Sequence, residues 1–235
     1  MKNKIILMLF FLITIKNFAQ IISGKITYKV TKEYNTESES YKFFKSQNPD
    51  CFYDELADEI SYEMQFSNKQ YLFYAVIDNL SNIRCADKIL TVLGTMNPDD
   101  FNLFNEDTFY RYMHHLGSHL IISKKPYEWI ITEETKTIQN FTCYKAYFIE
   151  TIDLGDEVKT NTHIVWFTPD LPFSYGPGNY YGLPGVILEA NNMGGKYTYG
   201  ASKIELNIEN PKLENNIKKL KEISKEITLE EYMKM

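Results

Sequence analysis

The residues best suited to metal chemistry are three histidines in the segment EDTFYRYMHHLGSHLIIS. If this segment were helical, His115 and His119 would lie one turn apart on one face, as paired zinc ligands do. Gly117 lies between them, however, and no glutamate occupies the position that a His-Glu-x-x-His motif requires. We therefore expect a loop leading into a strand. A metal site formed by His114, His115 and His119 is kept as the alternative.

A second stretch, SYGPGNYYGLPGVILEANN, concentrates glycine and proline before a short apolar run. No lysine follows its last glycines, as a phosphate-binding P-loop would need. Gly176, Gly178 and Gly182 also lack the final spacing of the dinucleotide-binding fingerprint. Ser174 has no glycine two residues before it, so the stretch is not a nucleophile elbow. The stretch is therefore predicted to be a rigid corner that delivers a strand.

Acid–base groups elsewhere suggest only weak alternatives. One alternative is a hydrolase triad of Ser174, His163 and Asp170. Ser174 opens this stretch, and the other two residues lie shortly before it. Adjacent carboxylates, such as Glu133 and Glu134, point to opposite faces of a strand and are expected to be solvated. We expect no catalytic residues and no cofactor, so the sequence favours a protein that is not an enzyme.

The elements that must position these residues are β-strands. In GKITYKV, apolar residues at positions 26, 28 and 30 alternate with polar ones, which is typical of a strand with one wet face. ISYEMQFSNKQYLFYAVI alternates in the same way on both sides of a polar turn, and this predicts an antiparallel hairpin. The alternation slips between Ala201 and Ile204, which predicts a β-bulge near Gly200. The last 25 residues, from Pro211, are charged and helix-prone.

The sum of these patterns predicts a mainly β fold: a single antiparallel curved sheet or half-barrel with a C-terminal helix. Such a sheet has an apolar concave side. We expect that side to be filled by aromatic side chains, or to hold a hydrophobic small ligand against a covering helix.

The N-terminus predicts export. Residues 1–19 resemble a secretory signal peptide, with lysines at the start and an apolar core of 11 residues, shorter than the roughly 20 that span a bilayer. Cleavage is expected near Ala19, leaving residues 20–235 as a single β-rich domain in the periplasm or outside the cell. After cleavage the chain is not expected to be an integral membrane protein.

Charge and cysteine content narrow the partners further. The chain has a formal net charge of −6 and only two arginines, Arg84 and Arg111, so nucleic acid is not expected as a partner. Three cysteines, at positions 51, 85 and 143, permit one disulfide in an oxidising compartment. Their spacing does not choose among the three pairings; we favour Cys51 with Cys85, worth roughly 3–4 kcal/mol by loop closure.

At the signature stretch the sequence resembles a known family. HIVWFTPDLPFSYGPGNYYGLPGVILE, preceded by YEWIITEETKTIQNFTCYKA, is similar to the GLPGLI family of small exported bacterial proteins. The signature is carried here by Gly182, Leu183, Pro184, Gly185, Val186 and Ile187, with valine at its fifth place. The resemblance is specific over about residues 127–190 and looser elsewhere.

This resemblance implies an exported protein of Gram-negative bacteria, often encoded near TonB-dependent outer-membrane receptors, and no assigned activity. We therefore predict a cell-envelope binding or accessory protein without catalytic activity. Its expected partner is an outer-membrane transporter or a hydrophobic small ligand. The alternative is the envelope metal-binding protein with the histidine cluster described above.

Two interpretations of the aromatic residues around the signature stay open. They either pack a structural corner, or they form the lip of a binding surface, as aromatic residues do in many interfaces. The residues of such a lip would be Trp166, Tyr175, Tyr180, Tyr181 and Leu183.

Overall fold

The computed structural model describes residues 23–31, 37–49, 51, 60–67, 70–77, 85, 101–105, 108–113, 119–123, 127–153, 157–192, 197–208, 213–232 and 234. The predicted signal peptide, residues 1–19, lies outside the described residues.

In the described part of the chain, twelve strands form one sheet in the order β12-β6-β5-β4-β3-β2-β1-β11-β10-β9-β8-β7. The strands are β1 (Ser23–Thr31), β2 (Ile60–Ser67), β3 (Gln70–Ile77), β4 (Phe101–Asn105), β5 (Thr108–Met113), β6 (His119–Ser123), β7 (Ile130–Ile138), β8 (Phe141–Asp153), β9 (Val158–Thr168), β10 (Val186–Asn192), β11 (Tyr197–Leu206) and β12 (Lys225–Thr228). The helices are α2 (Glu39–Gln47), α5 (Leu213–Ile223) and α6 (Leu229–Tyr232).

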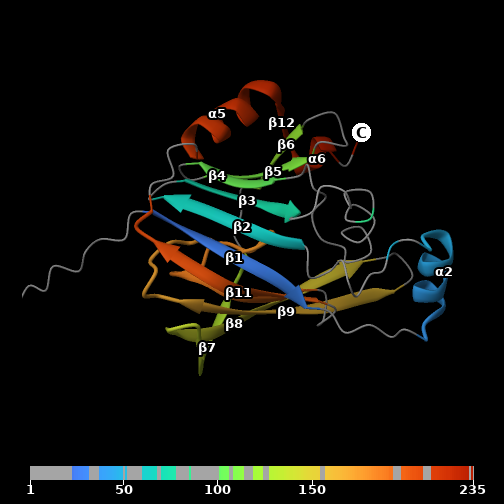
Figure 1. Cartoon of the computed structure of the whole chain (residues 1–235), viewed down its shortest axis with the longest axis horizontal. Coiled ribbons are helices and arrows are strands. Elements are labelled where there is room, and N and C mark those ends of the chain that lie inside the picture. The colour runs from blue at the N-terminus through green and yellow to red at the C-terminus, as the bar shows by residue number, and fades with distance from the viewer. Residues whose placement is uncertain are drawn as a thin grey trace, which may run out of the picture.

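The sheet consists of two meanders joined through its N-terminal strand. β2 to β6 follow one another on one side, β7 to β11 follow one another on the other, and β1 lies between β2 and β11 (Figure 1). The described strand pairs are antiparallel except β12 with β6, which is parallel. The sheet curves strongly without closing (Figure 1), so the predicted mainly β, curved-sheet fold is confirmed.

The inner face of this curve is packed with aromatic side chains. Tyr28 pairs with Tyr62 on one side and with Ala201 on the other, and all three side chains are buried in one cluster. The cluster continues along β11, where Tyr199 contacts Tyr62 edge-to-face at 5.1 Å between ring centroids. Because aromatic side chains bury a large apolar area each, they can fill a wide curve that aliphatic residues would leave hollow. Aromatic side chains therefore pack the concave side, as the first of the two expectations has it, and a hydrophobic ligand there stays a prediction.

Helix α5 packs on the opposite, outer face of the sheet. Its buried residues Leu213 and Ile217 lie against side chains of β3, β4 and β5. These side chains are Leu72, Leu103, Tyr110 and Tyr112. This C-terminal helix therefore lies outside the curve, above β4 and β5 (Figure 1), and does not cover the concave side.

Two local predictions can be compared with the structure. A register shift opposite Thr27 and Tyr28 leaves Ser202 unpaired in β11, two residues after Gly200, so the predicted bulge is present. The C-terminal segment is not helical throughout, because α5 ends at Ile223 and is followed by the short strand β12. None of the described helices combines the length and apolar character that a membrane crossing needs.

Candidate functional site

The signature segment occupies residues 169–185, between the end of β9 and the start of β10. Backbone hydrogen bonds fix its path: Val186 N donates to Leu171 O at 3.0 Å, and Ile187 N donates to Tyr175 O at 2.9 Å. A third, from Gly182 N to Ser174 O at 3.0 Å, closes a loop within the segment. The segment is thus tied to the first residues of the strand that it delivers.

Glycine is required in this segment for two different physical reasons. At Gly185 a Cβ atom would collide with the carbonyl of Thr168, so the two backbones approach too closely for any side chain. At Gly178 the backbone has φ +60°, a left-handed conformation that most residues adopt only with strain. The glycines therefore act as structural residues, as the corner interpretation predicts.

The aromatic side chains of the segment point into the protein. Tyr175, Tyr180 and Tyr181 are 3%, 4% and 7% exposed. Leu183 is 1% exposed. Trp166, on β9, is half-buried, with Lys136 Nζ 4.4 Å from the centre of its ring. The five residues predicted for a binding lip are therefore mostly interior; their binding role stays a prediction.

These aromatic residues connect the two halves of the sheet. Tyr175 stacks on Tyr71 of β3, with 4.9 Å between ring centroids. Tyr181 stacks on Phe109 of β5 at 4.4 Å. The segment thus crosses the inner face from the β9–β10 end towards β3 and β5, and it fills the curve of the sheet.

Three side-chain hydrogen bonds from other elements hold the segment and the start of β10 in place. Tyr28 Oη donates to Ile187 O at 2.7 Å. Asn102 Nδ2 donates to Gly178 O at 2.7 Å. Trp129 Nε1 donates to Tyr181 O at 2.9 Å. Because the acceptors are main-chain carbonyls, these bonds fix the backbone and leave the side chains of the segment free to pack.

A hydrogen-bonded triad links Tyr180 of the signature segment to His163 on β9 and Glu150 on β8. His163 Nδ1 is 2.8 Å from Tyr180 Oη, and Nε2 is 3.1 Å from Glu150 Oε2. With Nε2–H donating to the carboxylate, Nδ1 accepts from the tyrosine hydroxyl. Burial raises the pKa of Tyr180, so this residue is a neutral donor here and not a nucleophile. Phe148 stacks flat on the imidazole, with 4.5 Å between ring centres.

The contacts of His163 bear on the hydrolase hypothesis. Both ring nitrogens of His163 are engaged by Tyr180 and Glu150, so the imidazole is not shared with Ser174 or Asp170. The hypothetical triad of Ser174, His163 and Asp170 is therefore not assembled. Sequence reasoning missed Glu150 as a partner. The signal was available only through strand register, which sets Phe148 opposite His163 and Glu150 two residues further along β8.

The disulfide in the structure joins Cys51 and Cys85, with 5.3 Å between their Cα atoms. Cys143 is a free, buried cysteine. Burial raises its pKa to about 11, so its thiol stays protonated and unreactive at neutral pH.

The histidine cluster falls largely outside the described residues. His114 and His115 are not described, and of His119 only the backbone is, at the start of β6. The part of the chain that the structure does describe contains no group of three metal-binding side chains. The metal site stays a prediction.

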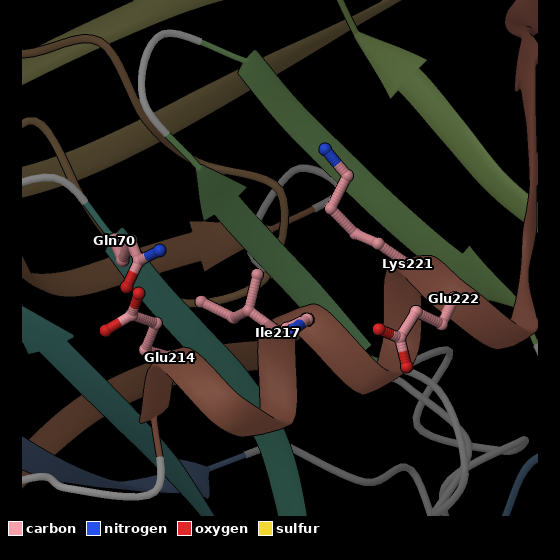
Figure 2. A pocket seen from close by; sticks show the side chains of 6 residues that line it. Gln70, Glu214, Ile217, Lys221 and Glu222 are labelled. Atoms are coloured by element: carbon pink, nitrogen blue, oxygen red, sulfur yellow. The ribbon is translucent and has the colours of Figure 1, made fainter.

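A surface groove of about 370 Å³ lies between α5 and the start of β3. Its lining is mostly charged: Gln70, Glu214, Ile217, Lys218, Lys221 and Glu222. Figure 2 shows Gln70 and Glu214 at one end and Lys221 and Glu222 at the other. Lys221 Nζ already has partners, Tyr110 Oη and Glu226 Oε1, each at 3.4 Å. The mixed charges that line the groove are more typical of a solvated helix surface than of a reaction site.

Comparison with known proteins singles out the signature segment. A family model described as a protein of unknown function (Porph_ging) matches residues 153–189, a range that contains all of the signature segment. No curated protein matches the chain.

Two solved structures of PNGF-II are similar to the chain as a whole. The one in space group P21 has a TM-score of 0.55 and 15% identity, covering 91% of this chain and 32% of the other. The one in space group C2 has a TM-score of 0.50 and 14% identity, covering 88% and 31%. This chain thus spans about a third of the length of those structures. At such low identity the likeness shows the fold alone.

Proposed function

We propose that this chain is an exported binding or accessory protein of the cell envelope, a member of the GLPGLI family without catalytic activity of its own. After cleavage near Ala19 it would act in the periplasm or outside the cell, serving a TonB-dependent outer-membrane transporter. The support is the signal-like N-terminus and the signature residues 182–187, which lie within the segment matched by a family of unknown function.

One observation carries the non-catalytic part of this proposal. The side chains in and beside the signature segment make structural contacts. Tyr175 and Tyr181 stack on β3 and β5, and both ring nitrogens of His163 on β9 are hydrogen-bonded. Catalytic side chains need an accessible reacting atom, whereas these groups face the interior. A half-barrel filled by its own aromatic side chains suits a docking module.

Native mass spectrometry of the mature protein, isolated from its own envelope, tests the proposal. The expected result is a chain that starts near Gln20 and carries a small molecule, together with cross-links to an outer-membrane transporter. A chain that retains Met1 would contradict export. A bare chain with no cross-linked partner would contradict the binding role. A zinc or copper adduct that is lost on replacing His114, His115 and His119 by alanine would favour the metal-binding alternative.

A further inference from the structure

The strands β9, β8 and β7, which end the sheet on one side, have two faces of different character (Figure 1). On one face, Phe148 and Val165 are buried together with Tyr180 and Leu183 of the signature segment. Because side chains alternate along a strand, the residues between these buried ones point away from the segment. They form a second face on the other side of the three strands.

We call this second face the β-branched face. The strand register arranges it in rows of directly opposed residues: Ile130, Tyr147 and Ile164; then Ile149 and Thr162; then Thr151 and Thr160. None of these residues is charged, although charged residues make up 24% of the chain. The uncharged rows end at the next register pair, Val158 with Asp153. Apart from Tyr147, the rows consist of isoleucine and threonine, whose stiff side chains have little rotamer freedom to lose on burial.

The β-branched face is exposed in the structure. Ile130 and Ile149 are 50% and 57% exposed, and Thr151, Thr160 and Thr162 are exposed as well. Isoleucine is among the residues most often found in protein interiors. Neighbouring apolar side chains that stay exposed on a folded domain commonly mark an interaction site. Because the opposite face of the same strands is buried, the strands are held in place and present this face rigidly.

The cations beside the β-branched face are paired within the chain. At one end the rows give way to Lys145 and Trp166, which are register partners. Lys145 Nζ lies 2.9 Å from Glu134 Oε1. Lys136, whose Nζ is 4.4 Å from the centre of the Trp166 ring, binds Glu189 at 2.7 Å. These ion pairs leave little charge at this end of the face to attract a charged partner.

We propose that two copies of this chain associate through their β-branched faces, which stack on each other in a two-fold symmetric dimer. The net charge of the chain favours this occupant. Each copy carries a formal charge of −6, so two copies can come into contact only where neither buries a like charge. A strongly basic partner would be drawn to acidic surfaces elsewhere, since this face offers no charge to pair with.

The order of the rows makes the β-branched face self-complementary. A two-fold axis that crosses the strands at the row of Ile149 and Thr162 brings this row against itself. The same axis sets the row of Ile130, Tyr147 and Ile164 against the threonine row of the other copy. Threonine methyl groups then contact isoleucine, and threonine hydroxyls can receive the hydroxyl of Tyr147. Face-to-face stacking of this kind is how two sheets pack in a β-sandwich.

The area of the β-branched face sets the strength of the dimer. From strand spacing and residue rise, the rows cover roughly 200–300 Å² in each copy. The total buried area, on the order of 500 Å², is well below the roughly 1,200 Å² at which stable complexes begin. The dimer is therefore weak and reversible, with a dissociation constant on the order of 10⁻⁴ M.

Sedimentation velocity of the mature chain, from about 10 µM to about 500 µM, tests the inference. We expect the sedimentation coefficient to rise with concentration from the monomer value towards that of a dimer. Ile149→Lys places two like charges in the centre of the interface and should weaken association at least about tenfold, so this variant stays monomeric over the range. Raising the salt concentration from about 50 mM to about 500 mM should not weaken the dimer, because no ion pair holds it together.

The matched control is Ile223→Lys, which adds the same charge at an isoleucine of α5 that is 64% exposed. It should dimerise like the unmodified chain. Circular dichroism of both variants confirms that each keeps the fold. Because both positions are exposed, neither substitution removes a buried contact.

Three results would overturn the inference: a chain that stays monomeric up to about 500 µM, a dimer that Ile149→Lys leaves intact, or a dimer that high salt dissolves. The last two would place the contact on another surface. The inference goes beyond the proposed envelope function, which involves other partners. A monomeric chain that still cross-links to a transporter would refute the dimer and support that function.

Discussion

Two buried tyrosine hydroxyls on the inner face differ in their hydrogen bonding. Tyr28 and Tyr71 are both fully buried on the inner face, in neighbouring parts of one cluster. Tyr28 Oη donates to a backbone carbonyl, whereas Tyr71 Oη has no partner in the structure. A buried hydroxyl without a hydrogen bond costs about 1–3 kcal/mol of desolvation, so the two residues should respond in opposite ways to the loss of an oxygen atom.

Tyr71→Phe is therefore expected to raise the free energy of unfolding by about 1 kcal/mol, because it removes an unsatisfied polar atom and keeps the ring stack. Tyr28→Phe, the matched control, should lower it by about 1 kcal/mol, because Ile187 O loses its donor. Urea unfolding of the ligand-free variants measures both. A loss in Tyr71→Phe equal to that in Tyr28→Phe would mean that the Tyr71 hydroxyl is bound by a water molecule.

At this scale the sequence predicted the residue types of the candidate site better than their contacts. The aromatic residues near the signature could be identified from composition and position alone. The bonds of His163 could not, because Tyr180 reaches it through an irregular segment and Glu150 through strand register.

Among the elements, the signature segment is the one whose shape depends most on glycine. Gly185 lies against the backbone of Thr168, which cannot move away because Thr168 is paired with Val186 in the sheet. In contrast, nothing lies within 4 Å of a Cβ atom built on Gly200 in β11. Gly200 is therefore a suitable control for the effect of adding a methyl group at Gly185.

Gly185→Ala is expected to destabilise the protein by about 3 kcal/mol or more, because the added methyl group forces the two backbones apart. Gly200→Ala should change stability by less than about 1 kcal/mol, because its methyl group meets open space. Thermal unfolding followed by circular dichroism would compare the variants. Equal effects in both would show that the close approach at Gly185 relaxes at little cost.

Strands with clear alternation could be predicted from the sequence, and these include β1, β2 and β3. Strand β12 could not, because its four residues follow a charged helix and carry no alternating pattern of their own. It is a strand because β6 supplies parallel partners for it, from Lys225 with His119 to Thr228 with Ile122. Tertiary pairing here overrides local propensity.

On the scale of the whole molecule, tyrosines whose side chains are wholly or partly buried are expected to make stability depend on alkaline pH. Burial raises the pKa of Tyr127 from 10.0 to about 12, and it raises the pKa values of Tyr28, Tyr71 and Tyr199 further. A group whose pKa is higher in the folded state keeps its full contribution below its unfolded pKa and loses it as the pH rises through the folded pKa.

Below about pH 10 these tyrosines are un-ionised in both states, so they should not make the free energy of unfolding change with pH. Between pH 10 and pH 12 the free energy of unfolding is expected to fall. Each such tyrosine contributes about 1.4 kcal/mol per pH unit in that window. Urea midpoints measured from pH 8 to pH 12, with phenolate absorbance recorded in parallel, check this. Tyrosine ionisation completed near pH 10 without loss of structure would contradict it.

The central position of β1 also bears on when the protein can fold. β1 joins the two meanders, and its pairing with β11 sets Gly24 opposite Leu206, across most of the chain. No part of the β1–β11 ladder can form before the residues of β11 have been synthesised. Long-range pairings of this kind are slow to form, because loop closure precedes any gain in contacts. If the chain crosses a membrane unfolded, β1 therefore cannot join the two meanders until the residues of β11 have emerged on the far side.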